Sequence, residues 1–304
     1  DFNHLYNIST YIIMNKLKTI SKLIKGTAQY SRFIISPDID RESKVNAELK
    51  DIGYIILPEF SSNEIGVFYN ADKNNHVIIH KGTQLTSQTM ATDIQSDFDL
   101  TMSGIGAKKQ FLKRRDDTVE IIRSIKEINP STSIELGGES LGGATSSYAF
   151  SYLDDKEGKY LHDNIDSLTT LNPAFPPKYL LPKKIDSVLF DLYKHVDKDT
   201  KKKIEQKPII HHRIKSDIVS KGLEKDVPFG KVMTYELDDN KGILHSHSVN
   251  RFIELSSNNE DGEIIEEKEQ EISLSPNIDM GYNISIRSLC KQYGSQFDER
   301  CKYY

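Results

Sequence analysis

The segment GESLG at positions 138–142 places Ser140 between two glycines, in the pattern G-x-S-x-G. A serine in this pattern is a candidate nucleophile when it sits on a tight turn between a strand and a helix. The glycines leave room for the turn, and the N-terminus of the helix directs N–H groups at the reacting oxygen. Because Gly and Ser are common, the pattern alone is weak evidence, and a loop of small residues is the alternative. The surrounding sequence has to decide between the two.

A serine hydroxyl near neutral pH needs a histidine to accept its proton and an acid to orient that histidine. Downstream, Asp217 stands in SDIVS, directly after the expected strand PIIHHRIK. Two histidines, His245 and His247, follow in ILHSHSVNRF. The order Ser, Asp, His is that of the α/β-hydrolases. We therefore expect Ser140 and Asp217 to act together with one of these two histidines.

The elements around Ser140 fit a strand, a turn and a helix. TSIEL before it is a short apolar strand, and SLGGATSSYAFSYL after it is a helix of small residues. A long helix is expected from about Lys108 to Ile128, ended by Pro130. Further strands are expected in GVFYNA and HVIIH, which form a hairpin, and in SLTTL, PIIHHRIK and KVMTYEL. This alternation predicts an α/β fold with a mainly parallel central sheet flanked by helices, and the turn at Ser140 together with the order Ser, Asp, His favours the α/β-hydrolase fold.

We divide the chain into an N-terminal helical segment at 1–60 that packs on the core, a hydrolase core at 61–255, and an acidic loop with a C-terminal extension at 256–304. In the first part, apolar residues recur at helical spacing between Ser9 and Lys25, and Gly26 is a suitable stop. We expect this amphipathic helix to cover the core, and the alternative is a helix on an anionic membrane surface. The acidic run SSNNEDGEIIEEKEQE is interpreted as a solvated loop or tail.

Composition excludes several classes of protein. A hydrophobic content of 37% and a formal net charge of -5 are typical of soluble globular proteins. No apolar run approaches the length of a membrane span, and no signal peptide is visible. Without a basic cluster we expect no nucleic-acid partner. The compartment stays open, with the cytoplasm and a virus particle as candidates.

We expect no metal and no organic cofactor. Two cysteines, Cys290 and Cys301, are too few for a disulfide framework or a four-ligand zinc site, and their redox state stays open. The adjacent histidines His211 and His212 lie on an expected strand, where neighbouring residues point to opposite faces. We therefore interpret one as inward and the other as outward, with no metal between them.

Four segments in order resemble the class 3 lipases, the α/β-hydrolases similar to fungal triacylglycerol lipases. VIIHKGT stands where the family commonly has an apolar strand followed by FRGT or FRGS, and GESLGG stands where it commonly has GHSLGG. TTLNPAF matches a strand that ends in Asn-Pro, and SDIVS matches an acid in D-x-V. The family's histidine is often followed closely by an aromatic residue, which fits His247 and Phe252 better than His245. The resemblance covers about Val67 to Phe252.

The resemblance implies a serine ester hydrolase that acts on acylglycerol or phospholipid through an acyl-enzyme, without a cofactor. It implies that Ser140, Asp217 and His247 form the catalytic triad and that Thr83 and Leu141 hold the oxyanion. The chain departs from the family at His80 and Lys81, which replace Phe and Arg, and at Glu139, which replaces His. Glu139 places a carboxylate beside the nucleophile, where it could alter substrate preference.

The segment Gln84–Ile105 follows the oxyanion residue, where the family often carries a lid, and its apolar residues fit either a lid or packing on the sheet. The expected partner is a lipid or another ester, with contact to a membrane surface as a candidate, and protein partners stay open. Two other functions remain as alternatives. One is a structural or attachment protein, for instance of a virus particle, that keeps the fold with little activity, and the other is a hydrolase of soluble esters or thioesters.

Overall fold

The computed structural model describes residues 2–35, 40–82, 105–153, 155–175, 196, 198–217, 219–220, 229–236, 247–257 and 263–268. Within these residues the strands form one eight-stranded sheet, in which their order follows the chain. Strands β3 to β7 are parallel, whereas β1, β2 and β8 pair antiparallel at the two edges. The strands are β1 (Ile55–Ile56), β2 (Ile65–Asn70), β3 (Asn75–His80), β4 (Ser133–Glu139), β5 (Ser167–Leu171), β6 (Ile209–Ile214), β7 (Lys231–Glu236) and β8 (Glu263–Lys268).

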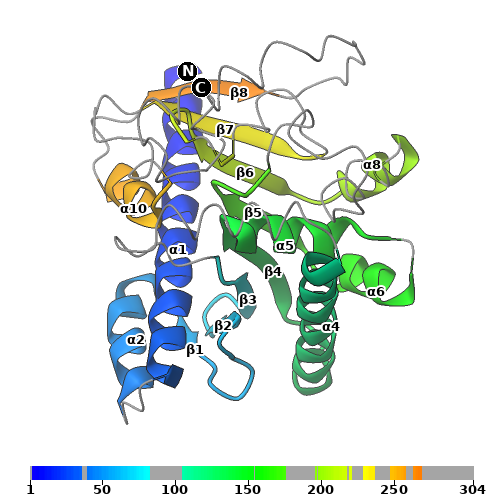
Figure 1. The fold of residues 1–304 in the computed structure, drawn as a ribbon. Coiled ribbons are helices and arrows are strands. Elements are labelled where there is room, and N and C mark those ends of the chain that lie inside the picture. Colours follow the sequence, from blue (N-terminus) through cyan, green and yellow to red (C-terminus); the bar gives the residue numbers. More distant parts are fainter. Residues whose placement is uncertain are drawn as a thin grey trace, which may run out of the picture.

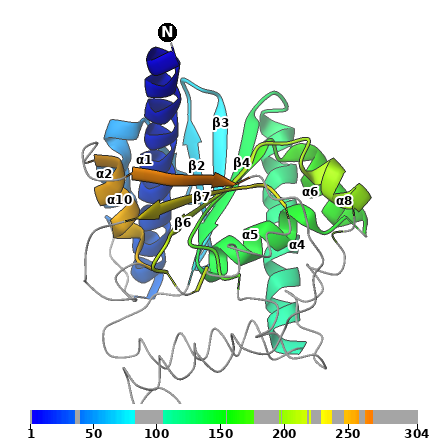
Figure 2. The same ribbon diagram turned by 90° about the horizontal axis from the view of Figure 1, so that it is seen from above.

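Helices cover both faces of the sheet (Figures 1 and 2). One face carries α4 (Ile105–Ile128), α5 (Leu141–Ser151), α6 (Lys156–Asn164) and α8 (Lys198–Ile204). The other carries α1 (Phe2–Ile35), α2 (Arg41–Leu49), the 3₁₀ turn η1 (Lys50–Ile52) and α10 (Val249–Ser257). The predicted α/β-hydrolase fold, a mainly parallel sheet flanked by helices, is therefore confirmed.

Each face of the sheet has its own apolar core. Ile78, Leu136 and Phe150 are fully buried on the face of α4 and α5. Leu17 and Ile79 are fully buried on the face of α1 and α10. Full burial of such a side chain stabilises the fold by about 1.5–3 kcal/mol. Because both faces are covered, polar residues of the inner strands such as Thr169, Thr170 and His211 are buried as well.

The N-terminal helix is longer than the sequence predicts. It extends to Ile35, and Gly26, predicted as its stop, lies inside it. A Cβ at Gly26 would lie 3.4 Å from Val45 and 3.5 Å from Phe68, so the glycine sits where α1 closely approaches α2 and β2. Figure 1 shows α1 running along the sheet, where its apolar residues are buried. The helix therefore covers the core.

Further expectations concern the acidic run, membrane-spanning helices and several predicted site residues. Part of the acidic run predicted as a loop is the strand β8, which pairs with β7 because an edge strand offers unpaired backbone groups. No helix in the described ranges has the length and apolar character to cross a membrane. Thr83, His245 and both cysteines lie outside the described residues, as does the suggested lid apart from its last residue, Ile105. The domain boundaries at 60 and 255 stay predictions.

Candidate active site

Ser140 occupies the turn between β4 and α5 in a backbone conformation that is rare for a residue with a Cβ. Its φ is 55° and its ψ is -126°. Such a conformation costs on the order of 1–3 kcal/mol, so the neighbouring structure has to hold it. The N–H of Ser140 donates to the carbonyl of Leu171 at 3.1 Å, and the N–H groups of Ala144 and Ala174 both donate to the Ser140 carbonyl. Three backbone hydrogen bonds thus hold the strained turn.

Two glycines allow the first turn of α5 to lie against the ends of β3 and β4. A Cβ at Gly138 would lie 2.5 Å from the carbonyl group of Gly142. A Cβ at Gly142 would lie 2.1 Å from the carbonyl oxygen of His80. Neither position has room for a side chain. The N–H of Leu141, at the first position of α5, has no acceptor within the helix and follows directly on Ser140.

The structure brings Ser140, His247 and Asp217 together from three separate parts of the chain. The Nε2 of His247 lies 2.7 Å from the Oγ of Ser140, and its Nδ1 lies 2.9 Å from Oδ1 of Asp217. All three side chains are buried. A carboxylate only accepts hydrogen bonds, so Nδ1 carries the proton and leaves Nε2 to accept the one on the serine hydroxyl. This tautomer suits a histidine that removes a proton from serine.

Asp217 is held in its ionised form. The N–H and the hydroxyl of Ser220 donate to Oδ2 at 2.9 and 2.5 Å, and the N–H of Val219 approaches Oδ1 at 3.3 Å. Burial alone would raise the pKa of Asp217, but the attraction of His247 and the hydrogen bonds from His247 and Ser220 outweigh it and lower the pKa. Ser220 is not predicted as a site residue from the sequence. Its signal is the spacing of three residues from an aspartate, which is typical of turns capped by a side chain.

Asn172 connects the serine turn to the strand that leads to Asp217. Its side-chain oxygen accepts the N–H of Ile214 at 2.9 Å, and its own N–H donates to the carbonyl of His212 at 2.7 Å. Its φ of 39° turns the chain towards Ala174, which donates to Ser140. In the sequence the Asn-Pro pair is only a motif. In the structure, its Asn172 links the serine turn to β6.

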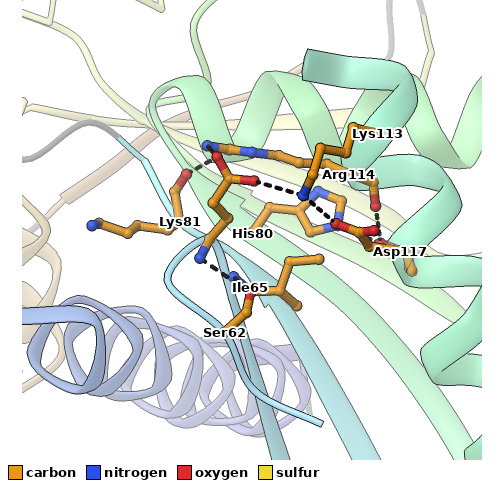
Figure 3. A network of polar contacts seen from close by, with 9 residues as sticks. Ser62, Ile65, His80, Lys81, Lys113, Arg114 and Asp117 are labelled. Atoms are coloured by element: carbon orange, nitrogen blue, oxygen red, sulfur yellow. Dashed lines mark hydrogen bonds and ion pairs between the residues drawn. The ribbon is translucent and has the colours of Figure 1, made fainter. Parts of the chain in front are cut away.

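The end of β3 is fixed by helix α4 (Figure 3). The Nη1 of Arg114 donates to the carbonyl of Lys81 at 2.8 Å, and the N–H of Lys81 donates to the carbonyl of Glu64 at 2.8 Å. His80 forms a hydrogen bond of 2.8 Å with the hydroxyl of Thr118, also on α4. Burial lowers the pKa of His80 to about 3, so this histidine is neutral and structural.

This anchoring places Gly82 against the serine turn. A Cβ at Gly82 would lie 2.4 Å from the carbonyl oxygen of Glu139 and 3.4 Å from the Cβ of Ser140. Gly82 is the last described residue before Thr83, the predicted oxyanion residue. The chain thus reaches Thr83 from a fixed point next to Ser140, although Thr83 itself lies outside the described residues.

The adjacent histidines of β6 point to opposite faces of the sheet, as predicted. Neither is exposed to solvent, so the prediction that one of them is outward is wrong. His211 contacts Thr170 and the carbonyl of Phe229, whereas His212 contacts the hydroxyl of Tyr235. Both are buried because helices cover both faces, and burial lowers their pKa values to about 4 and about 3. In the part of the chain that the structure describes, no group of three or more His, Cys, Asp or Glu side chains is arranged to hold a metal ion.

No family model and no curated protein matches this chain. Among solved structures, the native lipase–propeptide complex of Rhizomucor miehei is 16% identical, with a TM-score of 0.41, over 74% of this chain and 68% of that one. The lipase from Rhizopus microsporus var. chinensis is 16% identical, with a TM-score of 0.43, over 73% and 74% of the two chains. Lipase II from Rhizopus niveus is 15% identical, with a TM-score of 0.43, over 78% and 83%. The chain thus has solved fungal lipases among its structural neighbours, as the motifs predict.

Proposed function

We propose that this chain is a serine ester hydrolase in which Ser140 is the nucleophile, His247 the general base and Asp217 the acid that orients the base. The observation that carries the proposal is the continuous line of hydrogen bonds from Ser140 through His247 to Asp217, at 2.7 and 2.9 Å. The strained turn at Ser140 adds support, because a nucleophile elbow requires it.

The first step forms the acyl-enzyme. Nε2 of His247 takes the hydroxyl proton while Oγ of Ser140 bonds to the ester carbonyl carbon, whose oxygen becomes an oxyanion. The N–H of Leu141 is suited to stabilise this oxyanion, and the resemblance to class 3 lipases adds Thr83. One such donor changes the rate by about 10²–10³-fold. The protonated His247 then gives its proton to the leaving alkoxide, the bond between carbon and alkoxide breaks, and the alcohol departs.

The second step releases the acid. A water molecule gives a proton to Nε2 of His247 and attacks the acyl carbon, the bond to Oγ of Ser140 breaks, and the proton returns to the serine. Throughout, the ionised Asp217 stabilises the imidazolium that forms twice in each turnover. No step requires a metal or an organic cofactor.

For the substrate we infer a lipid acyl ester, either an acylglycerol or a phospholipid, which implies contact with a lipid surface. The support is the set of four ordered motifs that resemble the class 3 lipases between Val67 and Phe252. A hydrolase of soluble esters would share the same three residues. The two substrate classes differ in whether an aggregated substrate is needed for full activity.

Hydrolysis of short-chain and long-chain p-nitrophenyl esters, with and without detergent micelles, tests this proposal. We expect Ser140→Ala to lower kcat by about 10³–10⁶-fold, as loss of a serine nucleophile does. The matched control is Ser147→Ala on the same helix, whose hydroxyl donates to the Gly143 carbonyl, and it should retain turnover. Higher activity on the long chain in micelles supports a lipase. Equal activity on monomeric substrate supports a soluble esterase.

A fluorophosphonate probe provides a second readout that needs no turnover of an ester. The intact protein should gain one covalent adduct on Ser140, and Ser140→Ala should gain none. Absence of both labelling and hydrolysis of every ester, labelled phospholipids included, would overturn the proposed function and favour a structural role.

A further inference from the structure

A buried arginine of α4 holds the chain where β3 ends. The hydrogen-bonded pairs of β3 and β4 end with His80 and Gly138, so the carbonyl of Lys81 lies beyond the ladder. Arg114 donates from Nη1 to this carbonyl at 2.8 Å (Figure 3). Only 6% of Arg114 is exposed. A buried charge is costly unless it is paired, and a hydrogen bond from a charged donor is stronger than a neutral one.

Two further groups hold Lys81 from other directions. Its N–H donates to the carbonyl of Glu64 at 2.8 Å, and the carboxylate of Glu64 lies 3.7 Å from Nη2 of Arg114. Its ammonium donates to the hydroxyl of Ser31 on α1 at 2.5 Å. The residue after β3 is therefore fixed from α4, from the segment before β2 and from α1.

The peptide unit between Lys81 and Gly82 packs directly against the nucleophile turn. A Cβ at Gly142 would lie 2.7 Å from the carbonyl carbon of Lys81 and 2.8 Å from the nitrogen of Gly82. On the other side, a Cβ at Gly82 would lie 2.4 Å from the carbonyl oxygen of Glu139 and 3.4 Å from the Cβ of Ser140. Because a peptide unit is planar and rigid, a hydrogen bond to its carbonyl sets the orientation of the whole unit beside the nucleophile.

The packing of α4 on the sheet does not depend on this arginine. Phe111 and Ile122 of α4 are buried in the apolar core and supply that packing. The next residue, Arg115, is equally buried, but its Nη1 pairs with Asp155 at 2.7 Å. That contact joins α4 to the start of α6. Two adjacent buried arginines therefore hold different parts of the molecule, and Arg114 is the one that reaches β3.

We propose that Arg114 is a positioning residue of this site, which holds the peptide between Lys81 and Gly82 against the turn of Ser140 and so fixes the oxyanion side of the site. This inference rests on the proposed function. Gly82 directly precedes Thr83, which the resemblance to class 3 lipases implies as an oxyanion donor. A displaced donor weakens the stabilisation of the transition state more than the binding of the ester, so the effect falls on kcat.

Two pairs of variants test this role. Arg114→Met removes the donors and keeps an apolar stem, so kcat should fall by about 10–100-fold while KM changes by less than about threefold. Arg114→Lys keeps the charge with a less rigid donor and should recover part of kcat. The matched controls are Arg115→Met and Arg115→Lys, which alter an equally buried arginine of the same helix and should keep the kcat of the intact protein. Urea denaturation of all four variants measures the accompanying loss of stability.

Inhibition by a long-chain alkylboronic acid provides a readout that a purely structural role would not change. Oγ of Ser140 bonds to boron, the hydroxyl proton passes to His247, and one oxygen on the tetrahedral boron takes the place of the oxyanion. The inhibition constant should rise in Arg114→Met by about the factor by which kcat falls, and it should stay unchanged in Arg115→Met.

An unchanged kcat and inhibition constant in Arg114→Met, or equal losses in Arg115→Met, would overturn this inference even if Ser140-dependent hydrolysis is found. If Arg114→Met does not fold, the two lysine variants decide. A larger loss of kcat in Arg114→Lys than in Arg115→Lys supports the inference, and equal values overturn it. Absence of hydrolysis by the intact protein would overturn the proposed function instead, so the two failures are distinguishable.

Discussion

Two carboxylates belong to the candidate site, Asp217 in contact with His247 and Glu139 directly before Ser140, and their pKa values shift in opposite directions. Asp217, after β6, accepts hydrogen bonds from His247 and from both donors of Ser220, and its pKa is lowered although it is fully buried. Glu139 lies at the end of β4, and burial raises its pKa to about 7. Burial raises the pKa of both groups, but at Asp217 the attraction of His247 and the hydrogen bonds from His247 and Ser220 outweigh it.

The two carboxylates differ in the pH range over which they carry a charge. Asp217 is charged over the whole pH range in which a histidine can act, so it stabilises the imidazolium constantly. Glu139, whose pKa is raised to about 7, changes its charge near neutral pH.

Replacement of Asp217 by Asn should have the largest effect. The amide cannot hold the proton on Nδ1 as the carboxylate does and leaves the imidazolium without its adjacent charge, so we expect kcat to fall by about 10⁴-fold. Glu139→Gln should lower kcat far less, because the line from Ser140 to Asp217 stays intact. Steady-state kinetics of the two variants at pH 8 measures the comparison. Similar losses in both would show that the two carboxylates are equivalent.

Removal of one hydrogen-bond donor from Asp217 should raise its pKa, in the direction of the raised pKa of Glu139. Ser220→Ala deletes the hydroxyl that lies 2.5 Å from Oδ2 but keeps the backbone N–H. A buried carboxylate that loses a donor costs about 1–3 kcal/mol, so the free energy of unfolding at pH 7 should fall by that amount. Because the folded pKa of Asp217 is lowered, its stabilisation is present above the unfolded pKa and is lost as the pH falls. The deficit of Ser220→Ala in urea denaturation should therefore shrink towards pH 3, and a constant deficit would contradict this account.

The sequence predicts those parts of the site that depend on local pattern. The turn at Ser140 follows from glycines between an apolar run and a helix, and the order of Asp217 and His247 follows from their places after strands. The structure brings these three residues together, and their catalytic roles stay proposals. The supports were not predictable in the same way. Arg114 lies 33 positions from Lys81, and Asn172 lies 42 positions from Ile214, so only the folded chain pairs them.

The fold shows the same division between local and non-local information. The alternation of strands and helices predicts a parallel sheet, and the structure has one. The full extent of α1 past Gly26 depends on its packing against α2 and β2, and the burial of both His211 and His212 depends on helices covering both faces. Such packing arises from contacts between distant segments, so the sequence of one segment alone does not predict it.

The smallest effect expected is a gain in stability from Glu139→Gln. The folded pKa of Glu139, about 7, lies above the ordinary value of 4.5, so the contribution of this group to stability is present below the ordinary value and is lost as the pH rises through about 7. Gln does not titrate. Allowing for partial contact with solvent, the variant should be more stable than the intact protein by about 1–2 kcal/mol at pH 8 and nearly equal to it at pH 4.5.

Urea denaturation at these two pH values measures the gain, with Glu135→Gln as the control. Glu135 pairs with Lys16 and accepts the hydroxyl of Thr169, so its replacement should give no gain at pH 8. A loss of stability at pH 8 in Glu139→Gln would mean that the charge stabilises the folded state, as the charge of Asp217 does, and the contrast between the two carboxylates would disappear. A gain confined to alkaline pH would show that the charged carboxylate beside Ser140 is maintained at a cost to stability, as is expected of a group that serves the site and not the fold.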